Sequence, residues 1–529
     1  SLANNGGPTP THLILPGSAA IDAGPLTSLG VIDQRGQPRR VGPAVDIGAI
    51  ELSPVNQRVT PAESPPAESP PAESPPAAAQ PRDPRLENAD RQRQSNSVTI
   101  AGQAAPVLEE VAFQQLEGRL SEAYEQYWSV SADRTLTLQQ VQEMLQRAEQ
   151  AYSAKTAVVY PIFVSATATD PTRLADALAG PDGGEQELAL LLVPAVGEPV
   201  LRRVGVPQTT MLRQGRLFRS IVVDPDDVQG YRALSEKLHS WLLTPIEADL
   251  AQRSIDHLIY VPDAGLRTLP LAAMHDGEQF AIERYGLSIV PSMSLTQFGF
   301  ERTGAETVLA GGASEFEQLP PLPGVAVELA RVGAIAPESE VLLNPDFTFE
   351  NLTTVQRRLQ PDVLHLATHA EFTGGGAQSA YIQFWQARLS MRQLQSWDLD
   401  GVDLLILSAC TTAVGSPEAE LGFAGLAMAA GVESTVGSLW TVSDIATLAL
   451  MEVFHQQLSL GRGRAEALQL AQQQLLRGEV YLRQGQLVTP QGTVDLTDEL
   501  PDLEGLPPTV DFTHPFYWSA FVSVGNPWL

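Results

Sequence analysis

The chain has 529 residues, 43% of them hydrophobic and 18% charged, which is enough apolar material for two or three globular domains and excludes wholesale disorder. Lys and Arg total 33 against 62 Asp and Glu, a formal net charge of −29. Binding to nucleic acid or to anionic membranes needs concentrated positive charge, so both are poor partners, and no apolar run reaches the roughly 18 residues of a membrane span.

Residues 1–52 are rich in Gly, Pro and Asp. The order of the runs Pro16–Gly24, Asp33–Gly36 and Asp46–Glu51 resembles the closing coil of right-handed parallel β-helix surface proteins. The resemblance implies a terminal β-helix coil whose neighbouring coils precede it. Because the chain starts at Ser1, we expect a fragment of a longer secreted or cell-surface protein. An irregular Gly/Pro-rich tail and a cytoplasmic location are the alternatives.

A Pro-rich linker is predicted over residues 53–96. The pentapeptide Ala-Glu-Ser-Pro-Pro occurs three times in succession between Ala62 and Pro76. Proline fixes φ and removes a hydrogen-bond donor, so such a segment cannot pack a core. We expect an extended, semi-rigid spacer of polyproline type between the two flanking regions.

Residues 97–300 alternate helical and strand patterns. A capping box from Thr137 to Gln140 marks the start of one helix. The predicted helices are Phe113–Tyr127, Leu138–Ala148 and Tyr231–Leu243. The predicted strands, which are short apolar runs rich in β-branched residues, are Ala157–Val164, Glu187–Pro194, Ser220–Val223 and His257–Val261.

Residues 301–529 repeat this alternation with stronger strands. The predicted strands are Val308–Ala310, Val341–Leu343, Val363–Ala367, Leu404–Ser408, Glu433–Leu439 and Ala520–Val524. The predicted helices between them are Ala419–Ala430, Asp444–Leu458 and Ala465–Leu476. The pattern predicts an α/β fold made of two halves, 97–300 and 301–529, with helices covering the strands of each.

Two of these strands end in residues suited to nucleophilic chemistry. His369 follows the strand Val363–Ala367, and Cys410, the only cysteine, follows Leu404–Ser408. Loops at the carboxyl ends of adjacent strands form ligand sites in open α/β sheets. An imidazole beside a thiol, whose pKa is ordinarily near ~8.5, makes it a usable nucleophile. The alternative for Cys410 is a small buried hydrophobe.

A second histidine near the candidate site and the cysteine count bear on other kinds of chemistry. His365 lies inside the strand and is predicted to be a packed or hydrogen-bonded structural residue. With one cysteine the chain has no intramolecular disulfide and no metal site assembled from its own cysteines. The sequence contains no phosphate loop, dinucleotide fingerprint or paired-histidine metal motif, so we expect no cofactor and no metal.

At these residues the sequence resembles the CHAT family, caspase-like domains of the clan that also contains caspases, metacaspases, gingipains and separases. The matching segments are Val363–His369, Leu407–Thr412, Glu420–Ala427, Ala430–Val432, Val436–Trp440, Val442–Asp444 and His514–Phe521, with weaker similarity at Leu258–Leu271. The resemblance covers most of residues 97–529. It implies a caspase-like three-layer α/β fold with a degenerate half at 97–300 and a catalytic half at 301–529.

The resemblance implies a cysteine endopeptidase with Cys410 as nucleophile and His369 as general acid and base. The oxyanion hole would be formed by the backbone N–H groups of Cys410 and Ala370. Ala370 stands where caspases have glycine. An alanine still donates its N–H group but resists a positive φ, so a left-handed backbone there would compromise activity.

The same resemblance implies that substrate lies along the loop after the strand Glu433–Leu439 as an added antiparallel strand. Ser438 and Trp440 would then line a side-chain subsite in this loop. The alternative for Trp440 is a structural role, packed between the sheet and a helix, because a large aromatic ring is equally suited to that position.

Many relatives cleave after Arg or Lys and carry an acidic residue two positions before the nucleophile. Here that position is Ser408. If this chain prefers basic residues, the carboxylate must come from elsewhere, and Glu420 and Asp444 are the candidates. Either could instead cap the helix that follows it, because acidic side chains favour helix N-termini.

We therefore expect hydrolysis of polypeptide substrates through a thioacyl enzyme. Self-processing is a further expectation, with Arg202-Arg203 and Arg357-Arg358 as candidate cleavage sites. Two alternatives remain open. In the first, the caspase-like fold is catalytically silent and serves protein interaction. In the second, the molecule is chiefly a surface adhesin and the enzyme domain is secondary.

Overall fold

The computed structural model describes residues 2–3, 11–12, 110–128, 134–167, 173–178, 184–227, 230–300, 307–372, 381–390, 393, 397–408, 410–412, 431–497, 500 and 507–528. The chain forms two compact units, Ser1–Asp90 and Arg91–Leu529. In the first unit, strands β1 (Leu2–Ala3) and β2 (Thr11–His12) pair antiparallel. The rest of the predicted β-helix coil and the Pro-rich linker lie outside the described residues, so both stay predictions.

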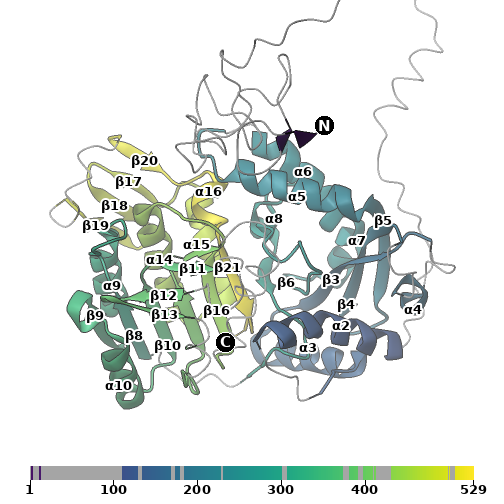
Figure 1. The fold of residues 1–529 in the computed structure, drawn as a ribbon, viewed down its shortest axis with the longest axis horizontal. Coiled ribbons are helices and arrows are strands. Elements are labelled where there is room, and N and C mark those ends of the chain that lie inside the picture. The colour runs from purple at the N-terminus through teal and green to yellow at the C-terminus, as the bar shows by residue number, and fades with distance from the viewer. Residues whose placement is uncertain are drawn as a thin grey trace, which may run out of the picture. The chain divides into compact units, whose positions relative to one another are not determined.

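The second unit contains an eleven-stranded sheet in the order β5-β4-β3-β6-β7-β21-β16-β14-β10-β8-β9 (Figure 1). Its strands are β3 (Thr156–Ser165), β4 (Gln186–Pro194), β5 (Val200–Pro207), β6 (His257–Tyr260), β7 (Gly286–Ile289), β8 (Thr307–Gly312), β9 (Glu338–Leu343), β10 (Val363–Ala367), β14 (Leu404–Leu407), β16 (Ser434–Ser438) and β21 (Phe521–Gly525). The pairs β3/β4, β4/β5 and β16/β21 are antiparallel, and the other neighbours are parallel. The molecule is an α/β protein with a large, mostly parallel sheet, consistent with a caspase-like fold.

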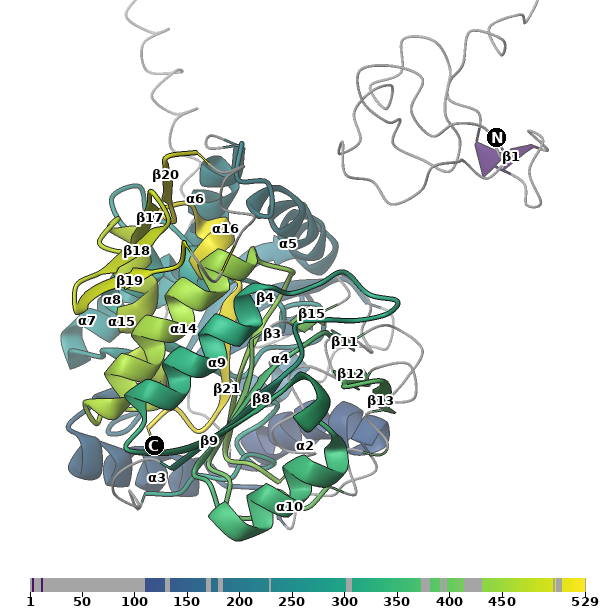
Figure 2. The same ribbon diagram turned by 90° about the vertical axis from the view of Figure 1, so that its left-hand side faces the viewer.

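Helices cover both faces of this sheet. They are α2 (Glu110–Trp128), α3 (Leu138–Tyr152), α4 (Leu174–Leu178), α5 (Gln208–Val222), α6 (Gly230–Leu242), α7 (Thr244–Arg253), α8 (Ala281–Arg284), α9 (Gly324–Ile335), α10 (Phe349–Leu359), α14 (Asp444–Ser459), α15 (Arg464–Leu476) and α16 (Pro515–Trp518). Figure 2 shows α9, α14 and α15 side by side on one face. Strands buried on both faces are near-continuous apolar runs, as in β3, where all ten residues are buried.

The predicted start of α3 is confirmed in detail. The hydroxyl of Thr137 accepts a hydrogen bond from the Gln140 N–H (3.1 Å), and the Gln140 side chain accepts one from the Thr137 N–H (3.0 Å). This reciprocal pair satisfies two backbone donors that a helix N-terminus leaves free. At the other end Ser153 closes the helix in the left-handed conformation, with φ 57°.

The prediction of a strand at Ser220–Val223 is wrong. Residues 220–222 form the last turn of α5, whose buried side chains include Met211 and Phe218. A four-residue apolar run does not distinguish a strand from one face of a buried helix. Strands β5 and β7 were not predicted, and the predicted helix Ala419–Ala430 lies outside the described residues.

One continuous sheet spans both predicted halves. Strand β7 pairs with the last strand of the chain, β21, with Ser288 opposite Ser523. Residues 91–529 form a single compact unit. The division into two caspase-like halves at residue 300 stays a prediction, and the sheet is continuous across it.

Two smaller sheets complete the second unit. One has the order β13-β12-β11-β15, with β11 (Ala370–Phe372), β12 (Tyr381–Phe384), β13 (Ala387–Ser390) and β15 (Cys410–Thr412). The other has the order β19-β18-β17-β20, with β17 (Tyr481–Arg483), β18 (Gln486–Thr489), β19 (Gly492–Asp495) and β20 (Thr509–Asp511). The first of these small sheets contains residues that the sequence predicts for the site.

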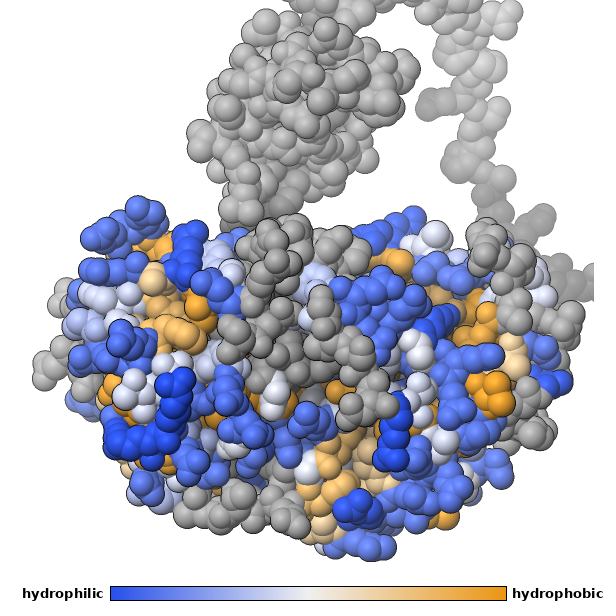
Figure 3. All heavy atoms as spheres, turned by 60° about the horizontal axis from the view of Figure 1, so that its bottom comes forward, coloured by the Kyte–Doolittle hydropathy of each residue, from blue (hydrophilic) through white to orange (hydrophobic). Residues whose placement is uncertain are grey.

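Hydrophilic residues predominate on the face of the described part that Figure 3 shows. The face in Figure 3 shows apolar residues in small, scattered groups. The exposed large hydrophobic side chains of the described residues belong to different segments: Val111, Val196, Leu217, Val341 and Leu460. Within the described ranges, every helix is too short or too polar to cross a membrane.

Candidate active site

The two strands that the sequence singled out are direct neighbours. β10 pairs in parallel with β14, with Val363 opposite Leu404 and Leu366 opposite Leu407. Both strands are fully buried, as their apolar sequences predict. Parallel strands end at the same edge of a sheet, so the residues after β10 and those after β14 leave the sheet together.

Beyond this edge the two segments pair a second time. β11 and β15 run parallel, and Ala370 lies directly opposite Cys410 in their register. Neighbouring strands are separated by about 4.8 Å. His369 immediately precedes Ala370 in the chain. It is therefore one residue away from the register partner of Cys410. The structure brings together the two segments that carry the predicted nucleophile and base.

The extended conformation at Ala370 removes one concern raised by the sequence. Ala370 is buried within β11, and it is not among the described residues that have a positive φ. Alanine adopts an extended backbone without strain. The glycine that caspases have here is therefore not required by the backbone conformation of this chain.

The imidazole of His369 is held by a backbone carbonyl. Its Nε2 lies 2.8 Å from the carbonyl oxygen of Pro320. A carbonyl only accepts hydrogen bonds, so Nε2 carries the proton and donates it. In the neutral ring Nδ1 then has the free lone pair. The ring is half-buried and packs against Phe316, with ring centroids 4.8 Å apart.

The loop that carries Phe316 and Pro320 follows β8 and is fixed at both ends. At its start, the Ser314 N–H donates to Asn344 Oδ1 (2.8 Å). At its end, the N–H of Gly324, the first residue of α9, donates to Asp444 Oδ2 (3.1 Å). These two hydrogen bonds restrain the ends of the loop whose Pro320 carbonyl contacts the imidazole.

Asp444 caps a helix, but not the one that the sequence suggests. It is the first residue of α14, yet its carboxylate accepts from the first N–H of α9, where the preceding Pro323 has no side-chain acceptor. Burial raises the pKa of Asp444 above its usual value and nearby Glu328 adds to this, whereas the Gly324 hydrogen bond and the charge of His369 oppose the rise. Asp444 is thus an electrostatic neighbour of the imidazole.

The other predicted substrate residues differ in their accessibility. Ser408 is buried, and its hydroxyl has no hydrogen-bond partner among the described residues. Ser438, the last residue of β16, is also buried. Trp440 is 5% exposed, and its indole N–H donates to the Phe516 carbonyl (3.1 Å). This contact fits the structural role for Trp440. Glu420 lies outside the described residues.

His365 belongs to a buried polar network beneath the site, in agreement with the structural role predicted for it. Its Nε2 lies 2.8 Å from Glu328 Oε1, and its Nδ1 lies 2.9 Å from His455 Nε2. All three side chains are buried. Burial, followed by the charge of His365, holds the pKa of His455 well below its usual value. The network joins β10 to α9 and α14.

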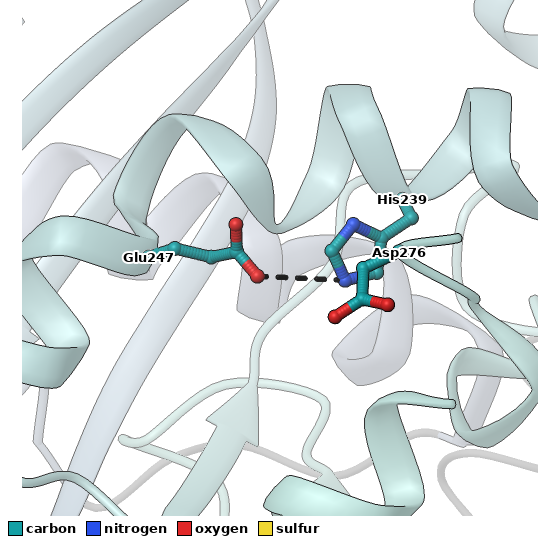
Figure 4. A group of neighbouring side chains, drawn as sticks. All are labelled: His239, Glu247 and Asp276. Carbon is teal, nitrogen blue, oxygen red and sulfur yellow. Dashed lines mark ion pairs between the residues drawn. The ribbon is translucent and has the colours of Figure 1, made fainter. Parts of the chain in front are cut away.

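A second polar group lies among α6, α7 and the loop before α8 (Figure 4). His239 Nε2 is 3.7 Å from Glu247 Oε1, and Asp276 is the third member. Arg284 Nη1 lies 3.0 Å from Glu247 and 3.6 Å from Asp276. This guanidinium already supplies the positive charge that a metal ion would bring, so the group is an ion-pair cluster.

A pocket of about 520 Å³ adjoins His369 and was not predicted from the sequence. It is lined by Glu315–Leu319 of the loop after β8 and by Gln383 and Trp385–Arg388 of the β12–β13 hairpin. Phe316 contacts the His369 ring, and the Gln383 N–H donates to the His369 carbonyl (2.8 Å). The signal in the sequence was the acidic pair Glu315 and Glu317, which lies three and five residues after the end of the buried strand β8.

Neither candidate self-cleavage site lies in a loop. Arg202 and Arg203 belong to β5, where they pair with Asp249 (2.8 Å) and Glu187 (2.5 Å) respectively. Arg357 and Arg358 lie in the last turn of α10. Peptidases cleave segments that are free to extend into a site, so both pairs are protected while these elements are folded.

Residues 232–526, more than half of the chain, match the model of the CHAT domain. A search of curated proteins gives no match. Among solved structures, separase of Saccharomyces cerevisiae in its complex with securin is 12% identical, with a TM-score of 0.38, over 74% of this chain and 32% of the separase chain. The Arg-specific cysteine proteinase gingipain R is 8% identical, with a TM-score of 0.32, over 58% of this chain and 70% of its own. The chain thus spans about a third of the length of the separase chain.

Proposed function

Because this chain belongs to the CHAT domain family, which is caspase-like and related to cysteine peptidases, we propose that it is a cysteine endopeptidase with Cys410 as nucleophile and His369 as general acid and base. The observation that carries the proposal is the register of β11 and β15. It sets Ala370 opposite Cys410, and so brings the only thiol-bearing residue of the chain beside the histidine segment.

The hydrogen bond to Pro320 supports different parts for the two ring nitrogens of His369 in the proposed reaction. Nε2–H is engaged by the carbonyl, so Nδ1 accepts the proton of the Cys410 thiol. The thiolate attacks the scissile carbonyl carbon, and a C–S bond forms. The imidazolium then returns its proton to the departing amine as the C–N bond breaks. Water hydrolyses the thioester by the same proton transfers in reverse.

Two further groups stabilise charge in this scheme. The oxyanion is accepted by the backbone N–H groups of Ala370 and Cys410, two residues that are register partners in the β11–β15 pair. The imidazolium is stabilised by the Pro320 carbonyl and by the Asp444 carboxylate, which already interacts electrostatically with the ring. A partial or full negative charge beside the ring favours its cationic form and therefore the thiolate.

The peptide on the acyl side of the scissile bond lies along the segment after β16. A preference for Arg or Lys before the scissile bond needs a carboxylate from Glu420 or Asp444, because Ser408 is buried and uncharged. Asp444 has its carboxylate committed to the Gly324 N–H, which leaves Glu420 as the better candidate.

A positional library of internally quenched peptides tests the proposed function. Wild type should cleave a subset of the library, and Cys410→Ala and His369→Gln should each lose that activity by a factor of roughly 10²–10⁴. His365→Gln is the matched control, because it removes a nearby imidazole that lies within β10 and outside the site. If wild type cleaves no peptide above the background of Cys410→Ala, the catalytically silent interaction module is favoured.

A further inference from the structure

The pocket beside His369 has the size and the walls of a binding site. Its volume of about 520 Å³ falls within the roughly 300–1,000 Å³ of small-molecule sites. Phe316, Leu319 and Trp385 provide apolar surface, and Trp385 is half-buried. Two carboxylates, Glu315 and Glu317, stand on the same loop as Phe316. We call this the Glu315–Glu317 pocket.

The charged side chains of this pocket that form no ion pair among the described residues are carboxylates. Glu315 and Glu317 are exposed, and neither forms an ion pair with any residue that the structure describes. The one cation of the lining, Arg388, stacks on the Tyr381 ring with its guanidinium 4.3 Å from the centroid. Its Nε donates to Gln383 Oε1 (3.1 Å). Arg388 is thus held on its own hairpin, and two carboxylates are left for a ligand.

The strand order of the main sheet indicates on which side of the scissile bond the Glu315–Glu317 pocket lies. The order β16-β14-β10-β8 places the β16 segment on one side of the Cys410 strand and β10 with β8 on the other. The pocket is built from the loop after β8 and the hairpin after β11, and it touches His369 through Phe316. A general acid protonates the departing amine, so the leaving-group peptide extends past the imidazole. This direction leads from the imidazole toward the Glu315–Glu317 pocket.

We propose that the Glu315–Glu317 pocket binds an arginine or lysine side chain of the substrate on the leaving-group side of the scissile bond. The inference rests on the proposed function for the direction of the peptide. The aliphatic stem of such a side chain lies on Phe316 and Leu319, and its cation faces the Trp385 ring and the two carboxylates. An arginine gains most, because its guanidinium bonds carboxylates with two parallel N–H donors.

The test uses three substrates that share one acyl-side sequence chosen from the library. Two are internally quenched peptides with Arg-Arg or Glu-Glu after the scissile bond, and the third ends in an aminocoumarin and has no residue there. The coumarin substrate normalises each variant for its amount of functional site. We expect wild type to favour Arg-Arg over Glu-Glu by roughly tenfold, as one or two charge-assisted contacts predict. This ratio should fall to about 1–2 in Glu315→Gln/Glu317→Gln, where those contacts are lost.

A matched control has the same change of net charge. Glu198 and Glu338 are exposed, lie outside the pocket, and pair with no cation in the described part of the chain. Glu198→Gln/Glu338→Gln should keep the wild-type ratio. A wild-type ratio in the pocket variant, or an equal fall in both double variants, would overturn the proposal, since the preference would then follow the overall charge of −29.

One outcome separates this inference from the proposed function. If wild type cleaves none of the three substrates, the peptidase proposal fails, and the pocket is judged by binding alone. Fluorescence anisotropy of labelled Ala-Arg-Arg-Ala and Ala-Glu-Glu-Ala peptides then decides. Tighter binding of the basic peptide that is lost in Glu315→Gln/Glu317→Gln supports a cation-binding pocket, and equal binding overturns it.

Discussion

The Nε2–H group of His369 donates a hydrogen bond to the carbonyl oxygen of Pro320 across 2.8 Å. The acceptor is a backbone atom, so a substitution at position 320 leaves this carbonyl oxygen in the chain. A carbonyl fixes the tautomer and orientation of the ring without adding a full negative charge beside it. The contact also joins the strand end of β10 to the loop after β8, which forms one wall of the neighbouring pocket.

The first prediction separates the two histidines of the β10 segment. His369→Gln should lower kcat/KM by roughly 10²–10⁴, because it removes a general acid and base. His365→Gln should cost about 3 kcal/mol of stability through the broken Glu328–His365–His455 network while keeping kcat/KM per folded molecule near wild type. Thermal unfolding and kinetics on both variants check this. Loss of activity in folded His365→Gln would contradict the assignment.

The second prediction separates the charge of Asp444 from its cap. Asp444→Asn keeps an oxygen acceptor for the Gly324 N–H but loses the charge near His369. Its kcat/KM at pH 8 should fall roughly tenfold, as loss of about 1.4 kcal/mol of interaction with the imidazolium predicts. Asp444→Ala should also lose about 1 kcal/mol of stability with the cap. A fully active, stable Asp444→Asn would reduce Asp444 to a helix cap.

The third prediction concerns acid. Burial, opposed by Asp276 and assisted by Arg284, lowers the pKa of His239 from 6.5 to about 4. The unfolded chain then binds more protons than the folded chain between these values, so His239 makes stability fall as the pH drops from 6.5 toward 4. The loss should reach roughly 3 kcal/mol.

The control for this prediction is a comparison of wild type with His239→Gln, because the two proteins share every other titratable group. Denaturant titrations of wild type and His239→Gln at pH 4.5, 5.5, 6.5 and 7.5 give the free energy of unfolding at each pH. The two proteins are then compared by how steeply this free energy changes with pH. His257, whose pKa burial also lowers to about 4, is present in both proteins and cancels. Parallel pH dependences would mean that His239 is not the titrating group.

Strands buried on both faces were the part of the fold that the sequence predicted best. β3, β10 and β14 are continuous apolar runs because both of their faces are covered, and each was located within one or two residues. Ser220–Val223 failed because such a run also fits a helix face. β5 carries Arg202 and Arg203 at the open edge of the sheet, so it lacked the apolar signal.

The residue types of the candidate site could be predicted from the sequence, but their spatial arrangement could not. Strand ends and residue types pointed to His369 and Cys410, but the pairing of Ala370 with Cys410 depends on the register of a second sheet. The partners Pro320 and Asp444 come from segments 49 and 75 residues away from His369 along the chain. Contacts across such separations are set by tertiary packing, which local sequence patterns do not contain.

The most direct test of the account is covalent trapping of the single thiol. Wild type, His369→Gln and Cys410→Ala are incubated with a peptidyl acyloxymethyl ketone, and the intact mass is followed over time. The account predicts one adduct on wild type, none on Cys410→Ala, and a rate at least roughly 100-fold lower on His369→Gln, because the imidazole generates the thiolate. Equal rates in wild type and His369→Gln would contradict the Cys410–His369 dyad.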